Sequence, residues 1–240
     1  MAHTHIVHAF DKDLEKIQGL LLEMGGLVEN QIVDAMTALT QRDAELGQQV
    51  LDKDKRIDQL EHKISEKTIR LLALRQPMAD DLRMVVAIMK VSASLERIGD
   101  YAKNIAKRLT VLMQTPPVGS SEKTLKRMGE MVQLMVCDVL NAFLKRDVEL
   151  AADVRRRDRD VDLMNNTMFR ELLTYMMEDP RSITACMHLL FIAKNIERAG
   201  DHTAGIADQV HYLVHGTLPD EKRSKGDVTS TMEVPPIEGS

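Results

Sequence analysis

Two stretches of the chain carry the same short cluster, LERIGDYAKNIAKR (residues 95–108) and IERAGDHTAGIADQV (residues 196–210). Both keep Glu-Arg-x-Gly-Asp in order. Apolar residues around each cluster recur at alternating spacings of four and three, which is the spacing of the seam by which helices pack in a bundle. The first seam comprises Met84, Ile88, Val91, Leu95, Ile98, Ala102, Ile105, Leu109 and Leu112, and the second Ile192, Ile196, Ala199, Thr203, Ile206, Val210 and Leu213. We therefore predict that both stretches are long helices of an all-α fold.

The clusters belong to a longer internal repeat. DAMTALTQRDAELGQQVLDKDKRID (residues 34–58) aligns with DVLNAFLKRDVELAADVRRRDRDVD (residues 138–162), 104 positions later, and the Glu-Arg-x-Gly-Asp cluster recurs 101 positions later. One unit of three helices, used twice, accounts for this pattern. Short turns between the helices favour an up-down-up bundle in each half. Helices are expected near residues 8–40, 43–74, 78–113, 122–145, 147–177 and 181–215.

The repeat sets the expected domains. We predict two tandem three-helix bundles, residues 1–115 and residues 120–216. The remaining segment, residues 217–240, is polar, rich in proline and glycine, and without helical periodicity. Such a composition cannot bury enough apolar surface to order itself, so a disordered tail is expected.

Composition excludes several classes of protein. The 240 residues are 44% hydrophobic but only 3% aromatic, with 16 Met and no Trp, a balance that favours packed helices over sheets. A net charge of −5 gives no general attraction to nucleic acid or to an anionic membrane. No apolar stretch is long enough to cross a bilayer, and Cys137 and Cys186 fall within apolar helical patterns as reduced core residues. We expect a cytoplasmic protein.

The repeated acidic residues are the candidate site. On the third helix, Glu96 and Asp100 are four residues apart and project from the side away from the seam, so their carboxylates are neighbours that repel each other. Glu197 and Asp201 repeat this pair in the second half. The second helix of each half carries further pairs at the same spacing, which are Asp54 with Asp58 and Asp158 with Asp162.

Two readings of these carboxylates compete. A single acidic pair is usually part of a solvated helix face, with Arg97 and Arg198 as its neutralising partners. The repetition of Glu, Arg, Gly and Asp, while neighbours such as Tyr101 and His202 diverge, favours a cation site. Oxygen ligands suit magnesium, manganese, calcium or iron, and a nitrogen from His202 would favour iron, manganese or zinc. An ordinary exposed histidine is an equal alternative for His202.

Gly99 and Gly200 are unfavourable within helices by about 1 kcal/mol each relative to alanine. A residue without a side chain is useful where another backbone or a bound ligand must approach closely. We therefore expect room beside each acidic pair.

With these clusters on the third helix of each repeat, the chain resembles the PhoU family. LEMGGLVENQIVDAMTAL, DKDKRIDQLEHKI and RQPMADDLRMVVAIMKVSASLERIGD also match, and the resemblance covers about residues 8–215. It implies a cytoplasmic homodimer of tandem three-helix bundles. It further implies a negative regulator of phosphate uptake and of the phosphate-starvation response, acting with the ATPase subunit of a phosphate ABC transporter and with a phosphate sensor histidine kinase. Contact with the membrane would come only through those partners.

The resemblance also implies metal binding at the repeated motifs, with Glu96, Asp100, Glu197 and Asp201 as ligands and Asp54, Asp58, Asp158 and Asp162 as supporting acids. The sequence departs from the pattern at Gly205, opposite Asn104, and at Asn165, opposite Glu61. These differences leave open whether the two sites bind the same metal.

Two other classes of function remain as alternatives. A metal-dependent enzyme could use the same carboxylates to activate water or oxygen. The chain lacks the Glu-x-x-His pairs of di-iron oxidases and any repeated base near the motif, which weighs against it. A purely structural helical scaffold would bind no metal. We expect a non-enzymatic adaptor.

Overall fold

The computed structural model describes residues 2–219 and 226–229, with side chains from residue 10 onward. Every regular element within this part of the chain is helical. The elements are α1 (Ala2–Gln41), α2 (Ala44–Arg75), α3 (Ala79–Leu112), α4 (Ser121–Lys145), α5 (Val148–Glu178), the 3-10 turn η1 (Pro180–Ser182) and α6 (Ile183–His215). The six long helices were therefore predicted correctly, with α1 beginning earlier than expected.

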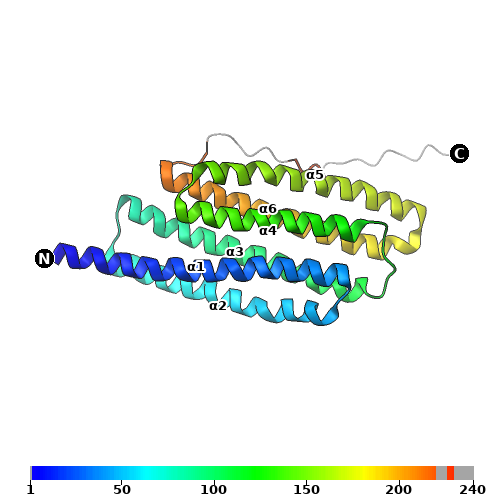
Figure 1. Ribbon diagram of the computed structural model, residues 1–240, viewed down its shortest axis with the longest axis horizontal. Helices are drawn as coiled ribbons and strands as arrows, with labels where there is room; N and C mark the ends of the chain where they lie inside the picture. The colour runs from blue at the N-terminus through cyan, green and yellow to red at the C-terminus, as the bar shows by residue number, and fades with distance from the viewer. Residues whose placement is uncertain (1, 220–225, 230–240) are drawn as a thin grey trace.

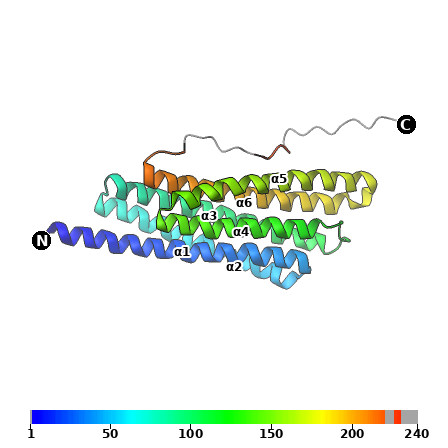
Figure 2. The ribbon, with the colours of Figure 1, turned by 45° about the horizontal axis from the view of Figure 1, so that its top comes forward.

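The helices all run along the long axis of the molecule, with α1–α3 on one side and α4–α6 on the other (Figures 1 and 2). Within each half the three helices pack against one another. The halves meet where α1 packs on α4 and α3 packs on α6. This arrangement confirms two tandem three-helix bundles and brings the two motif-bearing helices, α3 and α6, side by side.

The same turn starts the second helix of each half. Asp43 caps α2, its carboxylate accepting a hydrogen bond from the backbone N–H of Leu46 at 3.0 Å, and Asp147 caps α5 in the same way through Leu150 at 3.0 Å. A capping carboxylate satisfies a helical N–H that otherwise has no partner. The repeat thus extends to individual hydrogen bonds.

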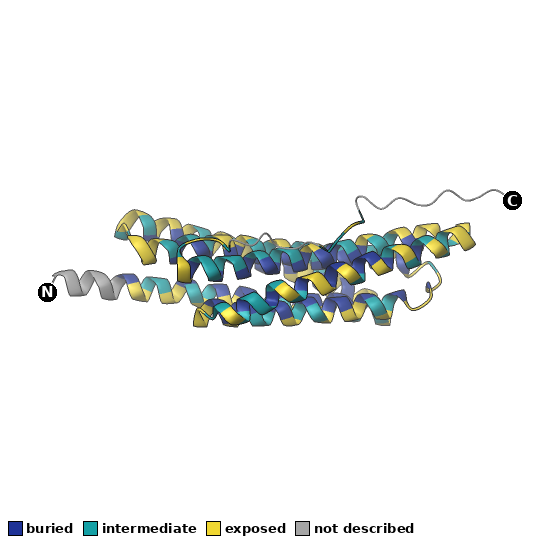
Figure 3. Ribbon diagram, turned by 90° about the horizontal axis from the view of Figure 1, so that it is seen from above, coloured by how far each residue is buried: buried dark blue, intermediate teal, exposed yellow. Residues whose placement is uncertain are grey.

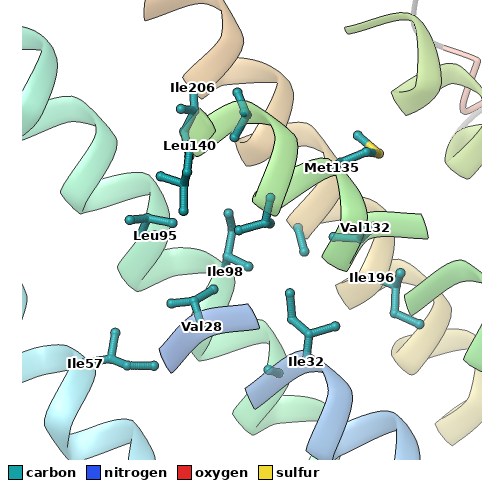
Figure 4. Packing of buried hydrophobic residues seen from close by; sticks show 14 of the residues in the cluster. Val28, Ile32, Ile57, Leu95, Ile98, Val132, Met135, Leu140, Ile196 and Ile206 are labelled. Carbon is teal, nitrogen blue, oxygen red and sulfur yellow. The ribbon is translucent and has the colours of Figure 1, made fainter. Parts of the chain in front are cut away.

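One apolar core joins the two halves. Buried side chains from all six long helices form a single cluster, and the outward faces of the helices are exposed (Figure 3). Figure 4 shows side chains of this cluster from both halves, with Val28 and Ile98 near each other and Val132 on the adjoining half. Cys186 is buried and Cys137 is half-buried, and neither forms a disulfide among the described residues. No helix among the described residues is long and apolar enough to span a membrane.

Close packing of α1 on α4 depends on a glycine. A Cβ on Gly25 would collide with Leu140 Cδ1, whereas a Cβ on the neighbouring Gly26 would meet nothing within 4 Å. Gly26→Ala is expected to raise the free energy of unfolding by up to about 1 kcal/mol, since alanine is the better helix former. Gly25→Ala gains the same propensity but overpacks the interface, so we expect it to be about 1–3 kcal/mol less stable than Gly26→Ala. Urea denaturation of both variants measures the difference, and equal stabilities would contradict this packing.

The predicted disordered tail lies mostly outside the described residues. Residues 226–229, a part of this segment that the structure describes, lie beside α5 (Figure 1). They make hydrogen bonds to α5 and an ion pair to α6. Apolar periodicity could not predict this contact, since a side-chain amide and a carboxylate on α5 hold the segment.

Candidate functional site

The first acidic cluster comprises Asp54, Asp58 and Glu61 on α2 with Glu96 and Asp100 on α3. Burial, followed by the charge of Asp100, raises the pKa of Glu96, and the charges of Asp58 and Glu61 add to this effect. Burial and then the charge of Asp54 raise the pKa of Asp58, although Lys103 acts in the opposite direction. The carboxylates of α2 and α3 are therefore close enough to raise one another's pKa.

A lysine already supplies a cation to this cluster. The Lys103 ammonium contacts Asp54 Oδ2 and lies 3.0 Å from Asp100 Oδ1, thereby joining α2 to α3. The hydrogen bond to Asp54 is the main cause that raises the pKa of Lys103, so the group stays charged. Gln31 on α1 donates a second hydrogen bond to the buried Asp54 carboxylate at 3.3 Å.

The second acidic cluster comprises Asp158 and Asp162 on α5 with Glu197 and Asp201 on α6. It is much less exposed than the first. The Glu197 residue is 2% exposed, whereas the Glu96 side chain is 26% exposed. The Lys194 ammonium lies 2.7 Å from Glu197 Oε2, and burial raises the pKa of Glu197 despite this partner. Glu197, the equivalent of Glu96, is therefore buried.

The two clusters are linked through His202. The rings of Tyr101 on α3 and His202 on α6 face each other with centroids 5.7 Å apart, and Tyr101 Oη lies 3.5 Å from His202 Nε2. His202 lines a hollow of about 640 Å³ beside the first cluster, and it also lines an adjoining hollow of about 490 Å³ beside Asp201. Burial and then the charge of Arg97 lower the pKa of His202, which leaves the ring neutral at pH 7. The residues that diverge between the repeats thus meet between the clusters.

The motif glycines serve helix packing. A Cβ on Gly99 would lie 3.0 Å from Gln31 Oε1 and 3.2 Å from Ile57 Cδ1, and one on Gly200 would lie 2.9 Å from Asp158 Oδ1. The space beside each glycine is filled by side chains of neighbouring helices. Side chains of the same half therefore fill the room that was expected beside the motifs. The structure shows no space for a ligand next to either glycine.

A metal would need some rearrangement of these residues. Within the described part of the chain, no group of three or more His, Cys, Asp or Glu side chains is placed to hold an ion. Lys103 and Lys194 occupy the positions where a cation would neutralise the carboxylates. Sequence reasoning missed both lysines, although each stands three residues from a motif acid, a spacing that places side chains on one helix face. The donor chemistry itself suits a hard cation.

Fold and site together define a duplicated helical-bundle protein with a charged polar face and no assembled catalytic constellation among the described residues. The PhoU domain family matches residues 21–109 and 125–210, one match for each half. The chain belongs to the PhoU family.

Relatives named "Phosphate-specific transport system accessory protein PhoU homolog" match nearly the whole chain. The protein from Caulobacter vibrioides (strain NA1000 / CB15N) is 46% identical over 226 residues, 94% of this chain and 98% of its own length. The protein from Rhizobium meliloti (strain 1021) is 43% identical over 232 residues, 97% and 98% of the two chains. These names are those of accessory proteins, and on that ground the expectation of a non-enzymatic protein holds.

Solved structures show the same fold. PhoU from Pseudomonas aeruginosa superposes with a TM-score of 0.84 at 43% identity, covering 87% of this chain and 100% of that one. The phosphate transport system regulatory protein PhoU from Streptococcus pneumoniae superposes with a TM-score of 0.82 at 31% identity, covering 88% and 100%.

Proposed function

We propose that this protein is a negative regulator of phosphate uptake and of the phosphate-starvation response, acting as a metal-binding adaptor. Its partners would be the ATPase subunit of a phosphate ABC transporter and a phosphate sensor histidine kinase. The names of its relatives support the link to phosphate transport. The observation that carries the metal-binding part is the placing of two carboxylate clusters on paired helices that meet at His202.

The ion-binding groups would be the eight repeated acids. Glu96, Asp100, Glu197 and Asp201 are the proposed ligands, and Asp54, Asp58, Asp158 and Asp162 are the proposed supporting acids. Iron, manganese, magnesium and zinc are the candidate ions, since carboxylate oxygens and one imidazole are at hand. An ion would supply the positive charge that Lys103 and Lys194 now provide.

The regulatory step follows from this exchange of cations. Each lysine joins two carboxylates, and the Lys103 ion pairs connect α2 with α3. Replacing a flexible ammonium by an ion with several fixed ligands would draw the helices together and set the shape of the surface that partners contact. Homodimer formation and a cytoplasmic location belong to the same proposal.

Asp100→Asn combined with Asp201→Asn tests the metal-binding proposal, because each change removes a charge from one cluster and keeps the side-chain size. We expect the variant, purified without an affinity tag, to lose most of the iron, manganese or zinc found in the wild-type protein by mass spectrometry. Partner binding should weaken in parallel. The matched control is Glu45→Gln with Glu149→Gln, a repeated pair of exposed acids in the first turns of α2 and α5. Equal metal content in all three proteins would refute the proposed ligands. Absence of metal from all three would refute metal binding and favour a purely structural helical scaffold.

A further inference from the structure

The tail segment, residues 226–229 (Gly-Asp-Val-Thr), lies in a groove on α5 and α6. The Gly226 N–H donates to Asp162 Oδ2 at 2.7 Å. Asn166 Nδ2 donates to the Gly226 carbonyl at 2.6 Å, while Asn166 Oδ1 accepts from the Val228 N–H at 3.1 Å. One amide side chain thus bonds a carbonyl and an N–H of the extended segment, as a neighbouring β-strand would.

The groove selects particular residues of the tail segment. A Cβ at Gly226 would lie 3.1 Å from Asp162 Cβ and 3.5 Å from the Arg159 carbonyl oxygen, so glycine fits best there. The Asp227 carboxylate lies 2.5 Å from Lys194 Nζ. It also accepts hydrogen bonds from the Thr229 N–H at 2.9 Å and from Thr229 Oγ1 at 2.7 Å. The groove therefore favours glycine at position 226 and a carboxylate at position 227, while Thr229 holds that carboxylate from within the segment, which gives the pattern Gly-Asp-x-Thr.

The first half of the molecule serves as an internal control for this groove. By the offsets of the repeat, Asn166 corresponds to His62 and Lys194 corresponds to Ala93. The first half therefore lacks both the amide and the ammonium that hold the tail segment.

The two halves also differ in how far an equivalent acid is buried. Asp162 is 1% exposed, and its equivalent Asp58 is exposed. Asp227 and Thr229 line, together with Glu197 and Asp201, a hollow of about 600 Å³ on the second half. The second acidic cluster is closed where the tail segment lies over it beside Lys194, whereas the first cluster has a lysine, Lys103, but no such segment over it among the described residues.

We propose that the α5–α6 groove is a docking site for an extended Gly-Asp-x-Thr segment and that residues 226–229 of the same chain fill it. The filled groove closes the second acidic cluster to cations. Only the closing of the second acidic cluster rests on the proposed metal-binding function. The docked tail holds the Lys194 ammonium between Glu197 and Asp227. Release of the tail removes Asp227 and uncovers Asp162 and Glu197.

The Asp227 carboxylate favours the docked state at neutral pH. Burial opposes the shift, but hydrogen bonds from Lys194 and Thr229 lower the pKa of Asp227 to about 2. A carboxyl whose pKa falls on docking contributes stability above its ordinary pKa of 3.8 and loses it as the pH falls toward 2.

Hydrogen exchange on the full-length chain tests docking directly. We expect the Gly226 and Val228 amides to exchange about 10–100 times more slowly than in a free peptide of residues 223–232, since each donates to a fixed acceptor. Asn166→Ala and Lys194→Ala should each restore most of the fast exchange, and Lys194→Ala only installs the residue that the first half has. Unprotected amides in the wild-type chain would overturn the proposal. So would protection that survives both variants.

Titration with Mn²⁺ separates the closing of the cluster from the metal-binding function. We expect the full-length chain to bind Mn²⁺ at the first cluster, and a chain ending at Pro219 to gain a second site that Glu197→Gln removes. Loss of a site on truncation would show that Asp227 is a ligand, which contradicts closure. Unchanged Mn²⁺ binding on truncation would also contradict closure. No Mn²⁺ binding by either chain would refute metal binding and closure together while leaving amide protection, and hence docking, intact.

Discussion

Replacement of Ile98 by alanine is expected to lower the free energy of unfolding by about 2–5 kcal/mol, the usual cost of deleting a buried aliphatic side chain and leaving a cavity. Ile98 is the variable residue within the first Glu-Arg-x-Gly-Asp cluster, and it is 0% exposed. Figure 4 shows its side chain in the region where residues of both halves meet. Because the core is one cluster, the loss should destabilise both halves together.

Urea denaturation followed by circular dichroism measures this effect. The wild-type protein and Ile98→Ala should each unfold in one transition, with the variant shifted to lower urea. Leu134→Ala is the control, since Leu134 is 55% exposed and its truncation should change stability by less than about 0.5 kcal/mol. Two separated transitions, with only the first-half transition moved by Ile98→Ala, would contradict a shared core.

Replacement of Lys103 by methionine should cost a comparable amount, about 3–5 kcal/mol in the absence of divalent cations. The substitution keeps much of the aliphatic chain but leaves the buried Asp54 carboxylate without its cation. Among the described residues, the Gln31 amide then remains as the hydrogen-bond donor to that carboxylate, at 3.3 Å. An uncompensated buried charge is much more costly than a lost surface ion pair.

Lys107→Met is the matched control, because Lys107 is exposed on the same helix one turn further on. Its loss should change stability by less than about 0.5 kcal/mol. Saturating Mn²⁺ should restore much of the stability of Lys103→Met and leave Lys107→Met unchanged, since only the first variant lacks a cation in the first acidic cluster. A loss below about 1 kcal/mol would mean that Lys103 does not hold the buried carboxylate.

The fold could be predicted from the sequence because the apolar spacings that indicate it are local and occur in both halves. The alternating spacing from Met84 to Leu112 predicted α3, and nearly every residue of that seam is buried in one core. The alignment of residues 34–58 with 138–162 predicted the second bundle, including the equivalent caps at Asp43 and Asp147. Periodicity sets the face of a helix, and duplication repeats it.

The candidate site could be predicted only in part, because periodicity describes one helix at a time. Periodicity placed Glu96 and Asp100 on the correct side of α3, but it treated the two halves as equivalent. The cations come from non-equivalent positions, Lys103 in one half and Lys194 in the other, where the repeat has Ala204 and Ala93. The cover of the second cluster comes from residues 226–229, whose contacts are polar and distant in sequence. A pattern of apolar spacings carries no information about such contacts.

The contacts between the halves join equivalent residues in reciprocal pairs, which indicates how the chain arose. Gly25 contacts Leu140, and its equivalent Gly129 contacts Met36, which is the equivalent of Leu140. Likewise Gln133 donates a hydrogen bond to its own equivalent, Glu29, as Tyr101 faces its equivalent, His202. Reciprocal pairs of this kind define an isologous, two-fold interface between identical subunits. The molecule is therefore built as a dimer of one three-helix ancestor fused into a single chain. Fusion lets residues beside the axis differ, and Tyr101 with His202 is such a pair.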